Sequence, residues 1–207
     1  MVGLSKEEKL NSVSHGIGAL LAIIGTFVLL KANEAKSSYA TFAIIVYSIT
    51  LISMLSVSSA YHGTANVRVK HRLRILDHVN IYFLIAGTYT PVSLITLIEG
   101  KGVSIFFVVW GIAFLGTFFK MFFTGRFEFI SLLLYLVMGW LIVFDLGSIL
   151  EQFTDLGIWL LFLGGLFYTF GILFYAFEKI PYNHFVWHLF VLAGATSHWF
   201  TMLYSVV

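Results

Sequence analysis

Long apolar runs constrain the fold of this chain more than any other feature. Between charged or turn-forming breaks, the sequence contains stretches of about 20 mostly apolar residues, the length that a helix needs to cross a bilayer core about 30 Å thick. These runs lie at about residues 12–30, 39–61, 76–98, 103–123, 127–146, 158–177 and 183–206. The sequence therefore predicts an all-α integral membrane protein, a bundle of seven transmembrane helices forming a single domain over residues 1–207.

Composition narrows the possible partners. Of the 207 residues, 59% are hydrophobic and 11% are charged, whereas soluble domains are roughly half apolar and a quarter charged. The chain has no cysteine, which excludes a disulfide framework and a thiolate metal site. A formal charge of +2 gives no basis for a nucleic-acid partner. We expect membrane lipids as partners, and any metal ion must be held by His, Asp or Glu.

The distribution of lysine and arginine predicts the orientation in the membrane. In a seven-span protein, the N-terminus and the second, fourth and sixth loops share one side. That side carries nine basic residues and the opposite side carries three. The nine are Lys6, Lys9, Arg68, Lys70, Arg72, Arg74, Lys120, Arg126 and Lys179. We therefore expect the N-terminus in the cytoplasm and the C-terminus outside.

Polar residues from three predicted helices fall at one depth, near the cytoplasmic boundary. The second helix ends with SVSSAYHG, which places Ser58 and His62 four residues apart on one face. The third helix starts within RLRILDHVN, which brings Asp77 to the same level. The last helix starts with NHFVWH, where His184 and His188 stack on one face about 6 Å apart. Five polar groups therefore converge at one end of the bundle.

Three imidazoles and a carboxylate are suited to zinc. Catalytic zinc sites hold the ion with three protein ligands and keep a fourth position open, and two histidines four residues apart on a helix supply two ligands from one face. His184 and His188 would provide these two, and His62 the third. Asp77 could bind the metal directly or hydrogen-bond to its water, and Ser58 could orient that water. The alternative for each single histidine is an interhelical hydrogen bond that serves packing only.

Two further histidines and a proline have separate interpretations. His15 opens the first span and could hydrogen-bond to a metal ligand or pack at the helix end. His198 lies about 15 Å beyond His188 along the last helix, which is too far to share the metal and favours an interhelical hydrogen bond. Pro91 lies in the middle of the third span and predicts a kink. The kink could open a cavity beside the metal site or serve packing alone.

These motifs resemble the hemolysin III family. The resemblance rests on SVSSAYHG, on the aspartate that starts the next helix followed by IAGTYTPV, on HFVWH followed by His198, and on SHGIG around His15. The family is grouped with the adiponectin and progestin receptors and, more remotely, with alkaline ceramidases. The resemblance implies seven helices, a cytoplasmic N-terminus and zinc near the cytoplasmic face of a bacterial plasma membrane.

Carried over by motif, the resemblance implies His62, His184 and His188 as zinc ligands, Asp77 acting through a water, and Ser58 beside the site. Together with the open coordination position, this predicts a zinc-dependent hydrolase of a lipid amide or ester, similar to a ceramidase. Two alternatives stay open. One is a non-enzymatic membrane receptor or sensor with structural zinc. The other is a pore-forming cytolysin, as the family's name suggests, although the spans show no continuous polar stripe. The oligomeric state is open.

Overall fold

The computed structural model describes residues 4–124, 126–177 and 179–207. Within these residues the regular secondary structure is helical, and seven helical segments are long and apolar enough to cross a membrane. The predicted all-α, seven-helix fold is therefore confirmed. The bounds are α1 Lys6–Ala32, α2 Ala40–Gly63, α3 Val67–Pro91 continued by η1 Val92–Thr96, α4 Gly102–Phe123, α5 Glu128–Gly139 continued by η2 Leu141–Asp145 and α6 Leu146–Gln152, α7 Asp155–Ala176, and α8 Asn183–Thr201 continued by η3 Met202–Val206.

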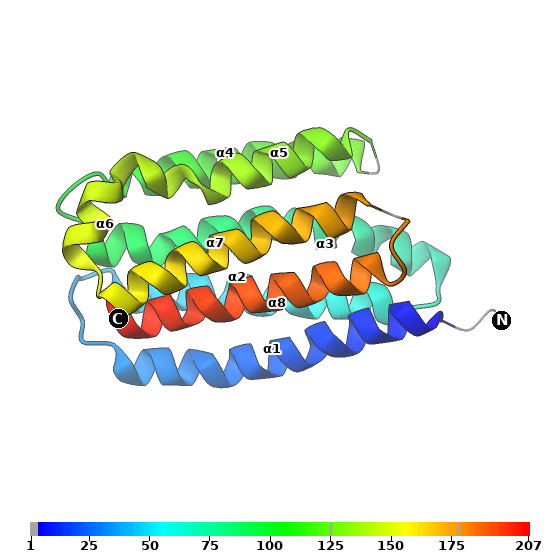
Figure 1. The fold of residues 1–207 in the computed structure, drawn as a ribbon, viewed down its shortest axis with the longest axis horizontal. Helices are drawn as coiled ribbons and strands as arrows, with labels where there is room; N and C mark the ends of the chain where they lie inside the picture. Colours follow the sequence, from blue (N-terminus) through cyan, green and yellow to red (C-terminus); the bar gives the residue numbers. More distant parts are fainter. Residues whose placement is uncertain (1–3, 125, 178) are drawn as a thin grey trace.

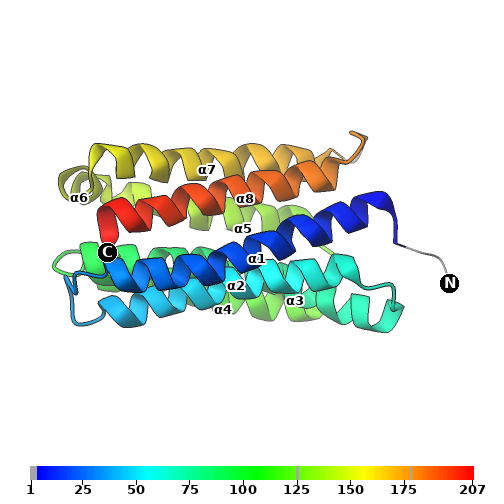
Figure 2. The same cartoon turned by 90° about the horizontal axis from the view of Figure 1, so that it is seen from below.

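The long helices run side by side along the longest axis of the molecule (Figure 1). The beginning of α1 and the end of the chain lie at opposite ends of that axis in both ribbon views (Figures 1 and 2). Helix α1 packs on α2, α2 on α3, and α3 on α4, while α8 packs on both α7 and α1. Helix α8 therefore brings the end of the sequence back against its beginning, and it carries two of the predicted metal ligands.

Large apolar side chains cover much of the outer surface. Many are more than half exposed, which is expected where lipid rather than water surrounds a protein. Examples from three different helices are Phe27, Leu115, Phe118, Trp159 and Phe170. The buried polar groups are instead turned toward the inside of the bundle, where helices contact one another. The chain is a multi-pass membrane protein by length, composition and surface.

Two helices start earlier than the apolar runs that predicted them. Helix α1 begins at Lys6 instead of about residue 12, and α3 begins at Val67 instead of about residue 76. Both starts are capped by short polar side chains. Ser5 accepts a hydrogen bond from the amide of Glu8 at 3.2 Å, and Asn66 accepts from the amides two and three residues later. The added turns are charged, so a scan for apolar residues omits them.

A row of glycines joins α7 to α8. Gly157, Gly164 and Gly171 are the buried residues of α7 and lie seven residues apart. A Cβ atom on Gly164 would overlap the ring of His198, and one on Gly157 would overlap the hydroxyl of Ser205. Small residues at such contacts let membrane helices approach closely. This row of glycines, Gly157, Gly164 and Gly171, fixes how α8 sits against α7.

The third transmembrane segment changes its pitch at the predicted position. The α-helix ends at Pro91, and the next five residues continue as a π-helix. Thr88 and Thr90 each donate a hydrogen bond at 2.8 Å to the carbonyl four residues earlier. Tyr89 acts differently, because its hydroxyl donates to the carbonyl of Gly139 at 3.0 Å and accepts from the amide of Ile142 at 2.8 Å.

Tyr89 thereby satisfies backbone groups at a break in the neighbouring segment. The expected fifth span, about residues 127–146, is an α-helix only as far as Gly139, and it continues through a 3-10 turn into α6, which ends at Gln152. Helix α5 packs against α3, α4 and α7. It forms one wall of the cavity described below.

Candidate metal site

The last turn of α2 and the first turns of α8 bring three histidines together. One ring nitrogen from each of His62, His184 and His188 lies within 4.8 Å of the other two. The ring centroids are 4.8 to 5.1 Å apart. Nitrogen ligands at about 2.1 Å from a tetrahedral zinc ion are about 3.4 Å from one another. Small side-chain movements are therefore enough to close this three-histidine group around an ion.

Two ring nitrogens of the three-histidine group have no hydrogen-bond partner among the residues that the structure describes. They are Nε2 of His62 and Nδ1 of His188, and both are buried. Leaving a buried polar atom unsatisfied costs about 1–3 kcal/mol, so native proteins usually give such atoms a partner. Imidazole nitrogens are common metal ligands. The three-histidine group therefore fits a metal ion, and its donor atoms alone do not select one metal.

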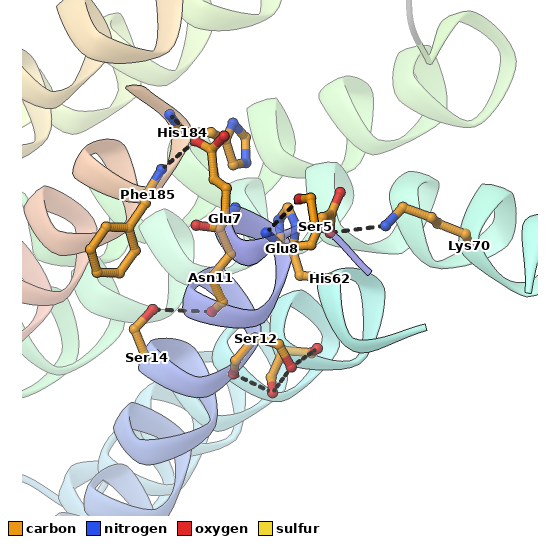
Figure 3. A network of polar contacts seen from close by, with 11 residues as sticks. Ser5, Glu7, Glu8, Asn11, Ser12, Ser14, His62, Lys70, His184 and Phe185 are labelled. Carbon is orange, nitrogen blue, oxygen red and sulfur yellow. Dashed lines mark hydrogen bonds and ion pairs between the residues drawn. The ribbon is translucent and has the colours of Figure 1, made fainter. Parts of the chain in front are cut away.

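A carboxylate that sequence reasoning missed lies behind His62. Glu8 in the first turn of α1 contacts Nδ1 of His62 through Oε2 at 2.8 Å. The same oxygen is 2.9 Å from Nζ of Lys70 on α3 (Figure 3). The signal that could have found Glu8 is SKEE, in which Ser5 and Glu8 have the spacing of a capping box and place the helix start before residue 12.

The neighbouring Glu7 contacts the start of α8. Its Oε1 accepts hydrogen bonds from the backbone amides of His184 at 3.1 Å and Phe185 at 3.3 Å (Figure 3). The residue before α8 is Tyr182, whose side chain makes no capping hydrogen bond and whose φ is 57°. Glu7 therefore supplies, from another helix, the acceptor that the first turn of α8 needs.

The other two histidines behave differently from each other. The ring of His15 stacks on that of His188 with centroids 3.8 Å apart and an interplanar angle of 24°. Neither ring nitrogen of His15 has a partner in the described part of the chain. His198 contacts the carbonyl oxygen of Leu161 through Nε2 at 3.2 Å, which is the expected interhelical hydrogen bond. His15 thus belongs to the surroundings of the site, and His198 serves packing.

Asp77 lies on α3 and Ser58 on α2. Both line the same cavity as His184 and His188. Ser58 is buried, and its side chain is a hydrogen-bonding neighbour of the Asp77 carboxyl group. Among the described residues, Asp77 is not part of the set whose ligand atoms lie within 4.8 Å of one another. Asp77 therefore lines the cavity without belonging to the three-histidine group.

The cavity at this site has a volume of about 760 Å³, within the range usual for small-molecule sites. At one end are the polar residues already described, together with Arg74 and Glu128. From there the cavity runs along α8 as far as His198, which is about 21 Å for the 14 residues from His184. Much of its wall is apolar and comes from α3, α5, α7 and α8: Ile81, Leu84, Leu132, Leu136, Ile172 and Val191.

Comparison with known proteins gives consistent matches along the whole chain. The family model described as "Haemolysin-III related" matches residues 4–199. Hemolysin-3 of Bacillus cereus is 39% identical over 208 residues, which cover 100% of this chain and 95% of that protein. The Hemolysin-3 homolog of Bacillus subtilis (strain 168) is 37% identical over 203 residues, covering 98% and 95%. The monocyte to macrophage differentiation factor of Homo sapiens is 26% identical over 205 residues, covering 95% and 83%.

Proposed function

The chain belongs to the haemolysin III family, and we propose that it is a zinc-dependent hydrolase that cleaves an amide or ester bond of a membrane lipid. One observation carries this proposal. A three-histidine group, with His62 and His188 buried and two ring nitrogens unpaired among the described residues, meets the polar end of a long, largely apolar cavity. His184 and His188 belong to both the group and the cavity wall. A lipid inside the cavity would therefore have its polar part at the metal site.

Each site residue has a role in this reaction. His62, His184 and His188 would hold the zinc, which when bound polarises a carbonyl group and activates water as a nucleophile. Asp77 would accept the proton of the attacking water as the new carbon–oxygen bond forms. It would then return that proton to the leaving amine or alcohol as the old bond breaks. Ser58 would donate its single hydroxyl proton either to the Asp77 carboxylate, which keeps that group oriented, or to the carbonyl oxygen.

The cavity supports a lipid as the substrate. Its apolar wall extends about 21 Å along α8, which suits an acyl chain. Arg74 lines it as well, and so does Glu128, which is paired with Lys120 at 2.7 Å; the wall therefore also carries charged groups near the site. Hydrolysis at the histidine end would release a fatty acid from the rest of the lipid.

Orientation and location follow the charge pattern and the relatives. Nine lysine and arginine residues against three favour a cytoplasmic N-terminus. The metal site would then lie near the cytoplasmic face, since α1 and α8 begin there. The relatives from Bacillus species support a bacterial plasma membrane as its location.

The test is to purify the protein in detergent, measure its metal content, and incubate it with a panel of lipid amides and esters while fatty-acid release is followed by mass spectrometry. His188→Ala should lose zinc and activity. Asp77→Ala should keep zinc and lose release, since a general acid–base residue contributes about 10²–10⁴-fold. The matched control is His71→Ala, because His71 is an exposed histidine in the first turns of α3. Full zinc occupancy in His188→Ala would show that the ligand assignment is wrong.

A second function has one observation in its favour. The metal group and its carboxylates link α1, α2 and α8, so a bound ion could serve to brace these helices in a membrane receptor or sensor. Zinc in the wild-type protein without fatty-acid release from any lipid of the panel would favour this function over hydrolysis.

A further inference from the structure

We propose that Glu8 is a positioning residue of the metal site, and that it selects which nitrogen of His62 faces the ion. The inference rests on the three-histidine metal site of the proposed function. It extends that site to the first turn of α1, which contributes none of the three ligands.

The contact between Glu8 and His62 determines the state of the imidazole. An ionised carboxylate only accepts hydrogen bonds, so the 2.8 Å contact to Oε2 requires a proton on Nδ1 of His62. In a neutral imidazole the lone pair is then on Nε2. Nε2 is the buried nitrogen of His62 that has no partner in the described part of the structure. The hydrogen bond therefore presents to the metal position the nitrogen that is able to coordinate.

Glu8 is itself held from two directions. Nζ of Lys70 lies 2.9 Å from the same Oε2, and the backbone amide of Glu8 donates to the hydroxyl of Ser5 at 3.2 Å. In a capping box the glutamate side chain turns back to the amide of the N-cap residue. Here it extends to α2 and α3 instead (Figure 3). The carboxylate is therefore a fixed acceptor where α1, α2 and α3 meet.

Glu7 positions the start of α8 in a similar way, through hydrogen bonds from another helix. Adjacent helical residues point about 100° apart, so Glu7 and Glu8 reach different helices. Glu7 accepts from the amides of His184 and Phe185, and this fixes the height of the helix start that carries His184 and His188. A negative charge at a helix N-terminus is also favourable because of the helix dipole. One turn of α1 thus positions all three candidate ligands.

Removing the hydrogen-bond partner of a metal-bound histidine typically weakens metal affinity about 10- to 100-fold. We expect about 100-fold weaker zinc binding in Glu8→Ala, the upper end of that range. Glu8→Gln keeps an oxygen that accepts from Nδ1 but loses the charge, so we expect about 10-fold, the lower end. The control is Glu34→Ala, since Glu34 is 70% exposed and pairs only weakly with Lys36 at 3.7 Å. Its zinc affinity should equal that of wild type.

The zinc dissociation constant is measured by competition with a chelator on the full chain in detergent, and the cobalt(II)-loaded protein gives a visible spectrum that reports ligand geometry. The melting temperature of the metal-free protein separates folding from positioning. Weaker binding with altered cobalt bands at an unchanged metal-free melting temperature supports the inference. Where Glu8→Ala does not fold, Glu8→Gln alone decides the question by the same measurements.

The inference and the proposed function fail in different ways. If wild type holds zinc, His188→Ala loses it, and Glu8→Gln and Glu8→Ala bind within twofold of wild type, only the role of Glu8 is overturned. Equal weakening in both variants together with a lowered metal-free melting temperature would assign Glu8 a structural role and would also overturn it. If wild type itself binds no zinc, the metal site is wrong and the inference goes with it.

Discussion

The contact between α7 and α8 gives a sharp test of how the site is held. Gly164 faces His198, and a Cβ atom there would overlap the imidazole ring and lie 3.2 Å from the carbonyl oxygen of Gly194. The ring cannot easily turn away, because its Nε2 contacts the carbonyl of Leu161. Gly165 is the natural control. A Cβ atom on Gly165 would meet the Trp140 ring at 3.4 Å, an ordinary van der Waals contact.

The two substitutions Gly164→Ala and Gly165→Ala make the same chemical change at adjacent positions of α7, and only the first creates an overlap. Each replaces a helical glycine by alanine, which favours the helix by about 1 kcal/mol. Only Gly164→Ala overfills a packed contact, at a cost of about 1–3 kcal/mol. The difference in unfolding free energy between the two variants should therefore be about 1–3 kcal/mol. For a chain of this length, 1 kcal/mol corresponds to about 2–4 °C, so Gly164→Ala should melt roughly 2–12 °C below Gly165→Ala.

The measurement is thermal unfolding in detergent without added metal, followed by zinc affinity of the folded protein. Separation of α7 from α8 should also weaken zinc binding, because α8 carries His184 and His188. Adding His198→Ala to Gly164→Ala removes the overlapping ring and should restore part of the lost stability, a non-additive effect expected of residues in contact. Equal melting temperatures for Gly164→Ala and Gly165→Ala would refute the described packing of α8.

Three other predictions follow from the site, the cavity and the charge pattern. Free zinc at 100 times its dissociation constant should stabilise wild type by about 2.7 kcal/mol, measured as a rise in melting temperature that a chelator reverses and His188→Ala lacks. Ile172→Trp should fill the cavity and reduce lipid hydrolysis at unchanged zinc content, whereas Leu173→Trp on the exposed face of α7 should not. Because the chain has no cysteine, single cysteines introduced as Glu34→Cys and Arg72→Cys can be labelled in intact cells with a maleimide that does not cross the membrane. Only the cysteine at position 34 should react. Labelling at position 72 instead would show that the N-terminus lies outside.

The fold was predictable because its main cause is local. A lipid-spanning helix needs about 20 apolar residues, and each run could be recognised without knowing its neighbours. The positions of the helix ends were harder to predict from the apolar runs. The charged first turns of α3 contain Arg68, Lys70, Arg72 and Arg74. Asn66 caps a helix that includes these residues, but their hydropathy alone places them outside a span.

The histidines of the site could be predicted from the sequence for a similar reason, whereas their carboxylate partners could not. His184 and His188 are neighbours on any helix, and His62 joins them because helices that cross the same membrane have matching ends. Glu8 and His62 are 54 residues apart in the sequence, and Glu7 and His184 are 177 apart. Only the lateral arrangement of α1, α2 and α8 decides that these pairs meet.

The hydrogen-bond partners of the imidazoles distinguish the packing histidine His198 from the candidate ligands His62 and His188. His198 is buried between helices and satisfies its Nε2 with a carbonyl oxygen, as expected where a histidine only links helices. Within the described part of the chain, His62 uses Nδ1 for Glu8 and leaves Nε2 unpaired, while His188 leaves Nδ1 unpaired. If all of these histidines served packing, each buried nitrogen should have a protein partner, since unsatisfied groups in an apolar interior are costly. The unpaired nitrogens of His62 and His188 belong instead to one three-histidine group at the end of a cavity, where a cation would complete their coordination.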